Sequence, residues 1–318
     1  MQRNAQVAKP SLEAIEVLGL GQACVDYLGT IPHYPDEDGK IELLDLRKEC
    51  GGPASTALVT LARLGINVSF LGSISTDPFG KDILEALLRE GVDTSFLKVT
   101  PGYTSQFAFI AITKGSARRT VFWHRGTVPH LIARDIDLRP FPGAKVLHLD
   151  GLMVEASMEA ASQAKERGIK VVMDAGTLRE GTMDLLPLID VLIASEHFAR
   201  PLTRSGSSPQ EDIKLLHELG PQEVLITMGE RGSLGLGREG LFFQEAFSVV
   251  PLDTTGAGDV YHGGYIYGLL QGWKMAECMR FASAIAAMNC REIGARRGIP
   301  NGPDEVYKFI REQASRKE

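Results

Sequence analysis

A nine-residue run in the last third of the chain combines small residues with acids. Residues 251–259 read Pro-Leu-Asp-Thr-Thr-Gly-Ala-Gly-Asp. Small residues at 256–258 let backbone N–H groups approach a ligand closely, and a helix that starts here adds the positive end of its dipole. Such a turn can hold an anion such as a phosphate. Asp259, in the first helical turn, is then placed to accept a proton from an attacking hydroxyl group.

The flanking residues predict the elements that hold this turn. The β-branched and aromatic residues of 247–250 predict a strand, and the apolar spacing of 260–270 predicts a helix that ends near Gly272. The alternative is a plain glycine-rich turn in which Asp259 only stabilises its own helix. An isolated Gly-x-Gly-Asp is more often of that kind.

A second glycine motif lies about 200 residues earlier. Gly51 and Gly52 precede a helix predicted over 53–64, whose buried face contains several leucines, and Gly65 ends it. Two adjacent glycines allow the backbone to contact a small polyol. Taken alone, this segment is equally consistent with an ordinary buried helix after a loop.

The two motifs together resemble those of the ribokinase-like sugar kinases, the PfkB family. The resemblance rests on residues 253–259 (Asp-Thr-Thr-Gly-Ala-Gly-Asp) and on residues 51–65. It implies that Gly256, Ala257 and Gly258 form the anion hole for the transferring phosphoryl group and that Asp259 is the catalytic base. It also implies a three-layer α/β/α fold with a mostly parallel central sheet and a small β-lid.

The order of predicted elements along the chain agrees with that fold class. Helices predicted over 81–90, 157–167 and 212–219 alternate with short apolar strands, which are expected at 15–20, 68–72, 146–149, 171–174, 191–194 and 223–227. Strands separated by helices indicate a parallel sheet covered on both faces. We therefore expect residues 1–318 to form a single domain.

Two segments break this alternation. Residues 27–50 and 103–125 contain strand-like stretches without helices between them. They resemble the lid that the family folds over its sugar site. A lid excludes water and so prevents hydrolysis of ATP when no sugar is bound. Whether the lid also forms a homodimer contact is left open.

The resemblance implies a set of sugar-binding residues. Asp26 follows the first strand, where the family places an acid that accepts hydrogen bonds from sugar hydroxyls; an Asx turn is the alternative. Gly51, Gly52 and Thr56 belong to the diglycine motif. Many family members carry Asn at the position of Thr56, so the change to Thr argues against ribose as the substrate.

The C-terminal segment narrows the expected sugar. The Gly-Asp-Val-aromatic-His-Gly run at 258–263 and the Arg-x-Gly-Ile-Pro at 296–300 resemble sulfofructose kinases and fructokinase-like relatives. The implied acceptor is a ketohexose-type sugar, with or without a sulfonate or phosphate group. Lys40 and Arg125, on the expected lid, are candidate partners for such an anion, and otherwise are ordinary solvated charges.

The nucleotide-binding half is marked less sharply. Thr227, Gly229 and Gly232 resemble the family's T-x-G-x-x-G turn, which contacts the ATP phosphates, and Asn289 is a further candidate contact. Mg²⁺ is expected because it neutralises charge between the β- and γ-phosphates. Ser195 and Phe198 replace the Asn and Glu of the family's N-x-x-E motif, which leaves Glu196 as the candidate acid that organises Mg²⁺ through water. Asp253 and Thr255 are candidates for holding a monovalent cation such as K⁺. Asp77 and Gly80 resemble a structural turn of the family.

The composition agrees with a cytoplasmic enzyme. The net charge of −6 argues against general binding to nucleic acid or to an anionic membrane. Residues 1–14 lack the apolar stretch of a secretory signal, and no apolar run approaches the length that crosses a bilayer. The four cysteines show no metal-binding spacing, and we expect reduced thiols.

Two other functions remain open on the sequence. A nucleoside kinase of the same fold would need an aromatic or apolar clamp for the base, which Phe107, Phe109 and Trp123 could supply. A sugar sensor without catalytic activity would be expected to lack the base or the anion hole, and this chain has both.

Overall fold

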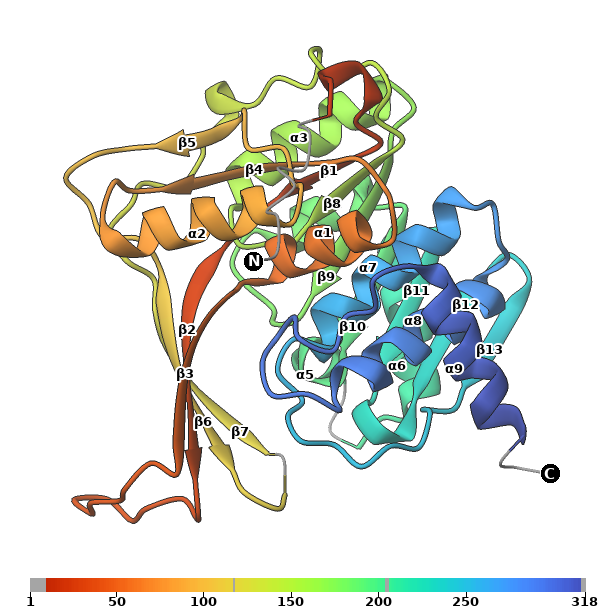
Figure 1. The fold of residues 1–318 in the computed structure, drawn as a ribbon. Coiled ribbons are helices and arrows are strands. Elements are labelled where there is room, and N and C mark those ends of the chain that lie inside the picture. Colours follow the sequence, from red (N-terminus) through yellow and green to blue (C-terminus); the bar gives the residue numbers. More distant parts are fainter. Residues whose placement is uncertain (1–9, 117, 204–205, 316–318) are drawn as a thin grey trace.

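The computed structural model describes residues 10–116, 118–203 and 206–315. In this part of the chain a nine-stranded sheet forms the centre, in the order β13-β12-β11-β10-β9-β8-β1-β4-β5 (Figure 1). The seven strands from β11 to β5 are parallel, and β12 and β13 are antiparallel. In sheet order, their bounds are Gly240–Gln244, Ser233–Gly237, Glu223–Thr227, Val191–Ser195, Lys170–Ala175, Val146–Leu149, Val17–Leu20, Val68–Ile74 and Leu97–Val99.

Helices cover both faces of this sheet, because its parallel strands are apolar on both sides. One face packs against α1 (Pro53–Arg63), α2 (Pro78–Arg89), α7 (Ala257–Leu270), α8 (Met275–Asn289) and α9 (Pro303–Ser315). The other face packs against α3 (Val154–Glu166), α4 (Thr182–Leu185), α5 (Glu196–Ala199) and α6 (Pro209–Glu218). Short 3₁₀ turns occur at Leu12–Ala14, Ala133–Asp135, Leu186–Leu188, Arg200–Leu202 and Gly229–Arg231. The predicted three-layer fold is confirmed.

A second, four-stranded sheet projects from the body in the order β3-β2-β6-β7 (Figure 1). Its strands are β2 (Cys24–Ile31), β3 (Asp45–Gly51), β6 (Phe107–Thr113) and β7 (Arg119–His124). They fall within or next to the two segments predicted as a lid, and we call this sheet the lid. The loop that joins β2 to β3 lies at the end of the lid farthest from α1 (Figure 1).

Two local predictions are wrong. Residues 247–250 form no strand, and Phe247 packs instead against Phe309 of α9, with ring centroids 5.6 Å apart. Residues 40–44 are irregular, and β3 begins at Asp45. Asp26 follows the first strand, as predicted, and lies within β2, the strand by which the chain enters the lid.

Other features agree with the sequence or fall outside the structure. The described residues include no helix that is long and apolar enough to span a membrane. All four cysteines are free thiols, and Asp77 caps α2 by accepting a hydrogen bond from the Gly80 amide at 2.9 Å, as its structural assignment predicts. Most of the N-terminal stretch considered as a signal, residues 1–9, lies outside the described residues.

Candidate functional site

The turn before α7 is fixed by hydrogen bonds of two side chains, those of Asp253 and Asn289. Asp253 accepts from the amide and the hydroxyl of Thr255, at 2.9 and 2.7 Å, and from the amide of Gly294 at 3.0 Å. Asn289 donates to the carbonyls of Thr255 and Ala295. These bonds hold residues 253–258 against the segment that follows α8, so the backbone of the turn is preorganised.

The two glycines of the turn have different roles. Gly256 has φ of 75°, and a Cβ there would lie 2.6 Å from the Ala295 carbonyl oxygen. The backbone conformation and the packing therefore require glycine at this position. Gly258 is inside the first turn of α7, and a Cβ built on it would meet no described heavy atom within 4 Å. The space beside Gly258 is therefore open at the positive end of a fourteen-residue helix. This is the geometry expected of the anion hole.

Asp259 follows directly and lies in an acidic surrounding. Burial and the neighbouring carboxylate of Asp174 raise the pKa of Asp259 to about 6, while the charges of His262, Arg119 and Arg296 act in the opposite direction. A carboxylate with a pKa somewhat below neutral is ionised at pH 7 and still basic enough to accept a proton. The raised pKa of Asp259 is thus compatible with its predicted role as the general base.

Asp26 and the diglycine motif lie together at the base of the lid. Asp26 is 5% exposed and accepts a hydrogen bond from the thiol of Cys24 at 3.0 Å. Burial raises the pKa of Asp26 to about 6, and the charge of Asp259 contributes in the same direction, which places the two acids near each other. A side chain at Gly51 would overlap the carboxylate of Asp26. Gly52 has φ of 101°, and a Cβ there would meet the Gln22 carbonyl oxygen at 2.6 Å.

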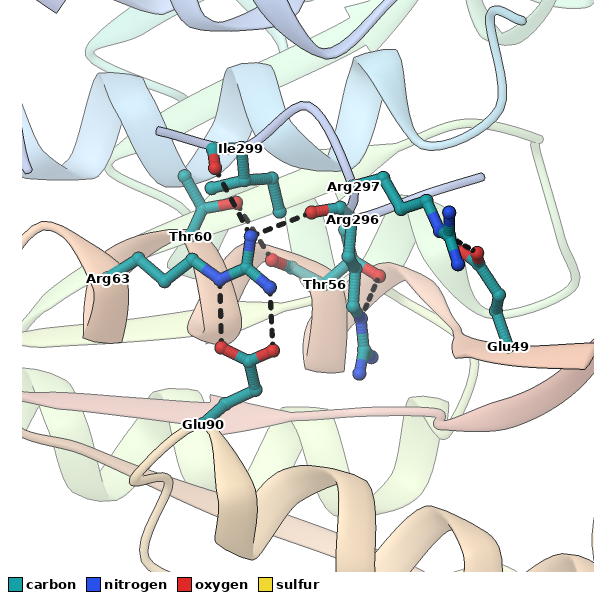
Figure 2. A network of polar contacts seen from close by, with 8 residues as sticks. All are labelled: Glu49, Thr56, Thr60, Arg63, Glu90, Arg296, Arg297 and Ile299. Carbon is teal, nitrogen blue, oxygen red and sulfur yellow. Dashed lines mark hydrogen bonds and ion pairs between the residues drawn. The ribbon is translucent and has the colours of Figure 1, made fainter. Parts of the chain in front are cut away.

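Thr56 does not have the exposure expected of a sugar contact. Its side chain is fully buried, and its hydroxyl oxygen accepts a hydrogen bond from Nε of Arg296 at 3.1 Å (Figure 2). The other side of the same guanidinium donates through Nη2 to the Gly51 carbonyl and the Ser55 hydroxyl, at 3.1 and 2.7 Å. We therefore correct the assignment of Thr56, which acts here through Arg296.

The two lid cations expected to bind an anion lie in different places. Lys40 is exposed on the loop between β2 and β3, away from α1 (Figure 1). Arg125 follows β7, and its guanidinium carbon lies 5.4 Å from the centre of the Trp123 indole. Arg179, which follows β9, approaches the same indole to 5.9 Å. Burial and these two arginines lower the pKa of His130, which places it near both.

The lid register shows that Trp123 faces the site and that the aromatic clamp is not assembled. Asp26 pairs with Ala108, which pairs with Trp123, so their side chains share one face of the lid. Phe107 and Phe109 flank Ala108 and must point to the opposite face. There Phe107 packs against Phe79 with ring centroids 5.2 Å apart. Strand alternation thus separates the three aromatic residues that a base clamp would need together.

A further lid residue contacts the anion-hole turn. Nη1 of Arg119, at the start of β7, donates to the Thr254 hydroxyl at 2.7 Å. The charge of Arg119 lowers the pKa of Asp259. The lid is thus connected to the catalytic turn by a cation that also acts on the base.

The residues expected to bind ATP form a turn between β11 and β12. Thr227 ends β11, while Gly229 and Gly232 have φ of 61° and 95° and close the turn. Next to it lies a pocket of about 660 Å³, whose lining includes Glu196, Arg200 and Arg231. Asn289 is fully buried and bonded to backbone carbonyls, so it supports the catalytic turn and does not reach a nucleotide. This corrects its assignment.

The carboxylates expected to bind metal ions, those of Glu196 and Asp253, both have protein partners. Glu196 forms an ion pair with Arg231 at 2.5 Å, and its carboxylate keeps 24% exposure. No group of three or more His, Cys, Asp or Glu side chains among the described residues is arranged to hold a metal ion. One accessible carboxylate nevertheless fits Mg²⁺, which is usually held by one or two protein ligands, substrate phosphates and water. Both oxygens of Asp253 are occupied by the hydrogen bonds described above, and K⁺ binding there stays a prediction.

Sequence reasoning missed four charged residues of this site: Asp174, Arg119, Arg179 and Arg296. Arg296 belongs to the 296–300 motif and Arg119 to the second lid segment. Nothing in the spacing of these segments shows that Arg296 contacts α1 or that Arg119 contacts the turn before α7. Asp174 ends a predicted strand, and a carboxylate at the end of a parallel strand is the one signal that could have identified it. Arg179 lies in a loop and gives no such signal.

Comparisons with known proteins show which family the chain resembles. The pattern described as "pfkB family carbohydrate kinase" matches residues 16–302. The chain is 28% identical to a ribokinase of Haemophilus influenzae, over 92% of this chain and 97% of that protein. It is 26% identical to a 5-dehydro-2-deoxygluconokinase of Clostridium perfringens, over 94% and 93% of the two chains.

Solved structures give the same result. A putative ribokinase from Agrobacterium tumefaciens superposes with a TM-score of 0.84 at 25% identity, over 95% of this chain and 99% of that one. More distant matches include a nucleoside kinase of Methanothermobacter thermautotrophicus, 23% identical over 92% and 95% of the two chains. They also include an Escherichia coli structure titled as a putative ribokinase II in complex with ATP and Mg²⁺, with a TM-score of 0.81 at 22% identity and coverage of 94% and 99%. Because the family pattern covers most of the chain, this protein belongs to the pfkB family of carbohydrate kinases.

Proposed function

We propose that this protein transfers the γ-phosphoryl group of ATP to a hydroxyl of a small ketose-type sugar that carries an anionic group. The observation that carries the proposal is the pair formed by Gly258 and Asp259. An open space at a helix N-terminus adjoins a carboxylate whose pKa is about 6. Members of this family are phosphotransferases that act on sugar hydroxyls, and the chain has the base and the anion hole that this reaction needs.

The residues present account for the transfer. Asp26 and the Gly51–Gly52 backbone bind hydroxyls of the acceptor, and the lid excludes water from the site. Asp259 accepts the proton of the attacking hydroxyl, and the backbone N–H groups of residues 256–258 stabilise charge on the transferred group. Mg²⁺, when bound with ATP, neutralises phosphate charge, and Glu196 is the residue placed to hold its water shell.

The lid favours an anionic acceptor. Arg125 and Arg179 approach one indole ring from two different segments, on the lid face that also presents Asp26. Among the described residues, neither guanidinium forms an ion pair with a carboxylate. Two such cations suit a sulfonate, carboxylate or phosphate on the sugar. The name of the Clostridium perfringens relative, 5-dehydro-2-deoxygluconokinase, denotes an acidic acceptor as well.

Two other functions fit less well. A nucleoside kinase is the function named for one relative, but the aromatic residues that would hold the base lie on opposite faces of the lid. A sugar sensor needs no general base, and here Asp259 and the turn before it are intact and preorganised. Neither alternative explains the paired arginines at Trp123.

The test is ATP-dependent phosphorylation measured by coupled ADP release over a panel of acceptors. The panel contains fructose, sulfofructose, gluconate-derived keto acids, ribose and adenosine. We expect saturable activity on an anionic ketose, and turnover lower by ~10²–10⁴-fold for Asp259→Asn. Activity on adenosine alone would replace this proposal with the nucleoside kinase, and wild-type protein without activity on any acceptor would refute catalysis of this kind.

A further inference from the structure

Arg296 is a buried cation between α1 and the candidate sugar site. It is 7% exposed, and its three hydrogen bonds go to uncharged acceptors on residues 51–56. Among the described residues, no carboxylate lies within ion-pair distance of its guanidinium. Burying a cation without a paired acid is costly, and an apolar side chain of similar volume would usually serve stability as well or better. Stability therefore does not explain why a buried arginine lies at position 296.

The rest of the network shows that the position of Arg296 is fixed. Arg63 of α1 forms two hydrogen bonds with the carboxylate of Glu90, at 2.8 and 2.7 Å. Nη1 of Arg63 then donates to the carbonyls of Arg296 and Ile299, at 2.8 and 3.2 Å (Figure 2). The backbone of the segment after α8 is thereby tied to α1, and the guanidinium of Arg296 is directed at the diglycine turn.

The titratable groups around Arg296 come from several elements. Its charge acts on the thiols of Cys24 in β2 and Cys50 in β3, whose pKa values burial raises, and on the carboxylates of Asp26 in β2, Glu90 after α2 and Asp259 in α7. Glu49 of β3 is nearby but is paired with Arg297. Asp174 of β9, His262 of α7 and Arg119 of β7 act on Asp259 from its other sides. Among these groups, Arg296 is a cation whose charge lowers the pKa of both Asp26 and Asp259.

We propose that Arg296 is a positioning residue for phosphoryl transfer: its hydrogen bonds fix the diglycine turn, and its buried charge acts on Asp26 and Asp259 while the acceptor binds. Its guanidinium supplies donors beside Thr56, where many members of the family carry an amide side chain. The proposal rests on the proposed function, because it takes Asp259 as the base and Asp26 as a sugar contact. The buried charge lowers the pKa of both acids, against the effect of burial.

The experiment compares Arg296→Gln and Arg296→Lys with Arg291→Gln, a matched control. Arg291 is exposed on the same segment after α8. The pH profile of kcat/KM is measured for each variant on the best acceptor, together with the thermal midpoint. Loss of a unit charge in a partly buried site moves a neighbouring pKa by about 1 unit. We therefore expect the acid limb of Arg296→Gln to move up by about 1 pH unit. The lost hydrogen bonds to the diglycine turn should in addition lower kcat/KM on the plateau above that limb by ~10–100-fold.

Arg296→Lys keeps the charge but loses the planar fork. Its acid limb should stay near that of the wild type, while KM for the acceptor rises. Arg291→Gln should match the wild type in both respects. If Arg296→Gln folds and loses activity uniformly at all pH values, the residue is structural only and the proposal is overturned. If Arg296→Gln does not fold, Arg296→Lys decides, since a wild-type KM there would refute the positioning role.

Failure of this inference is distinguishable from failure of the proposed function. Wild-type protein without ATP-dependent activity on any acceptor would refute the proposed function itself. An active wild type and an inactive Asp259→Asn, combined with an unshifted acid limb in Arg296→Gln, would refute only the role of Arg296.

Discussion

Replacement of Gly258 should separate catalysis from folding. A Cβ at this position meets no described heavy atom within 4 Å, and Gly258 is not among the residues with positive φ. Ala in place of Gly within a helix stabilises it by roughly 0.5–1 kcal/mol, so Gly258→Ala should fold at least as well as the wild type. The thermal midpoint should rise by about 1–2 °C. Gly258→Val should also remain folded, with a smaller gain because Val is a weaker helix former.

Activity should change in the opposite direction. The added methyl groups occupy the open space where the transferring phosphoryl group is expected, and they keep it from the backbone N–H groups. Loss of one such stabilising contact typically lowers kcat by ~10²–10³-fold, or about 2.7–4 kcal/mol. We expect a loss of this size for Gly258→Val and a smaller one for Gly258→Ala. Initial rates by coupled ADP release and thermal midpoints by scanning fluorimetry measure both effects.

Gly256→Ala is the matched control for folding. Its Cβ would lie 2.6 Å from the Ala295 carbonyl oxygen, and its φ of 75° is strained for any L-residue. This variant should lose stability as well as activity, by ~1–3 kcal/mol. A Gly258→Val protein with near-wild-type kcat/KM would show that no phosphoryl group passes beside Gly258, and the anion-hole assignment would be wrong.

Three other predictions concern the acids and the lid. Asp259→Asn should lower turnover by ~10²–10⁴-fold. The pKa of Asp259 is higher in the folded protein than in the unfolded chain, so ionised Asp259 destabilises the fold above about pH 6. The thermal midpoint of Asp259→Asn at pH 7.5 should therefore be higher than that of the wild type. Unchanged turnover in this variant would remove Asp259 from the mechanism. Wild-type kcat/KM should fall as the pH decreases through about 6, and a limb near pH 4 would contradict the raised pKa. Arg125→Ala and Arg179→Ala should each lower kcat/KM for sulfofructose by roughly ten- to a hundred-fold more than for fructose. Lys40→Ala should change kcat/KM little for either sugar. Equal losses on the two sugars in the arginine variants would mean that these residues position the lid.

Local patterns were sufficient for most of the fold. The apolar strands, the helices between them and the two helix-free lid segments follow from residue periodicity, which depends on neighbours a few positions apart. The errors occur where a partner decides the outcome. Residues 247–250 have strand-forming composition, but they pair with no strand, and Phe247 packs on α9 instead.

The catalytic turn was determined by the sequence itself, since an anion hole followed by a base consists of consecutive residues on one helix N-terminus. The sugar side was decided only by the tertiary structure. Arg296 lies 240 positions from Thr56 and donates to it, and Arg125 and Arg179 share the Trp123 ring only because the lid brings that ring close to the loop after β9. The same folding buries Thr56 and Asn289, which the sequence predicts as ligand contacts. Burial and long-range charge depend on which segments pack together, and local sequence patterns do not contain that information.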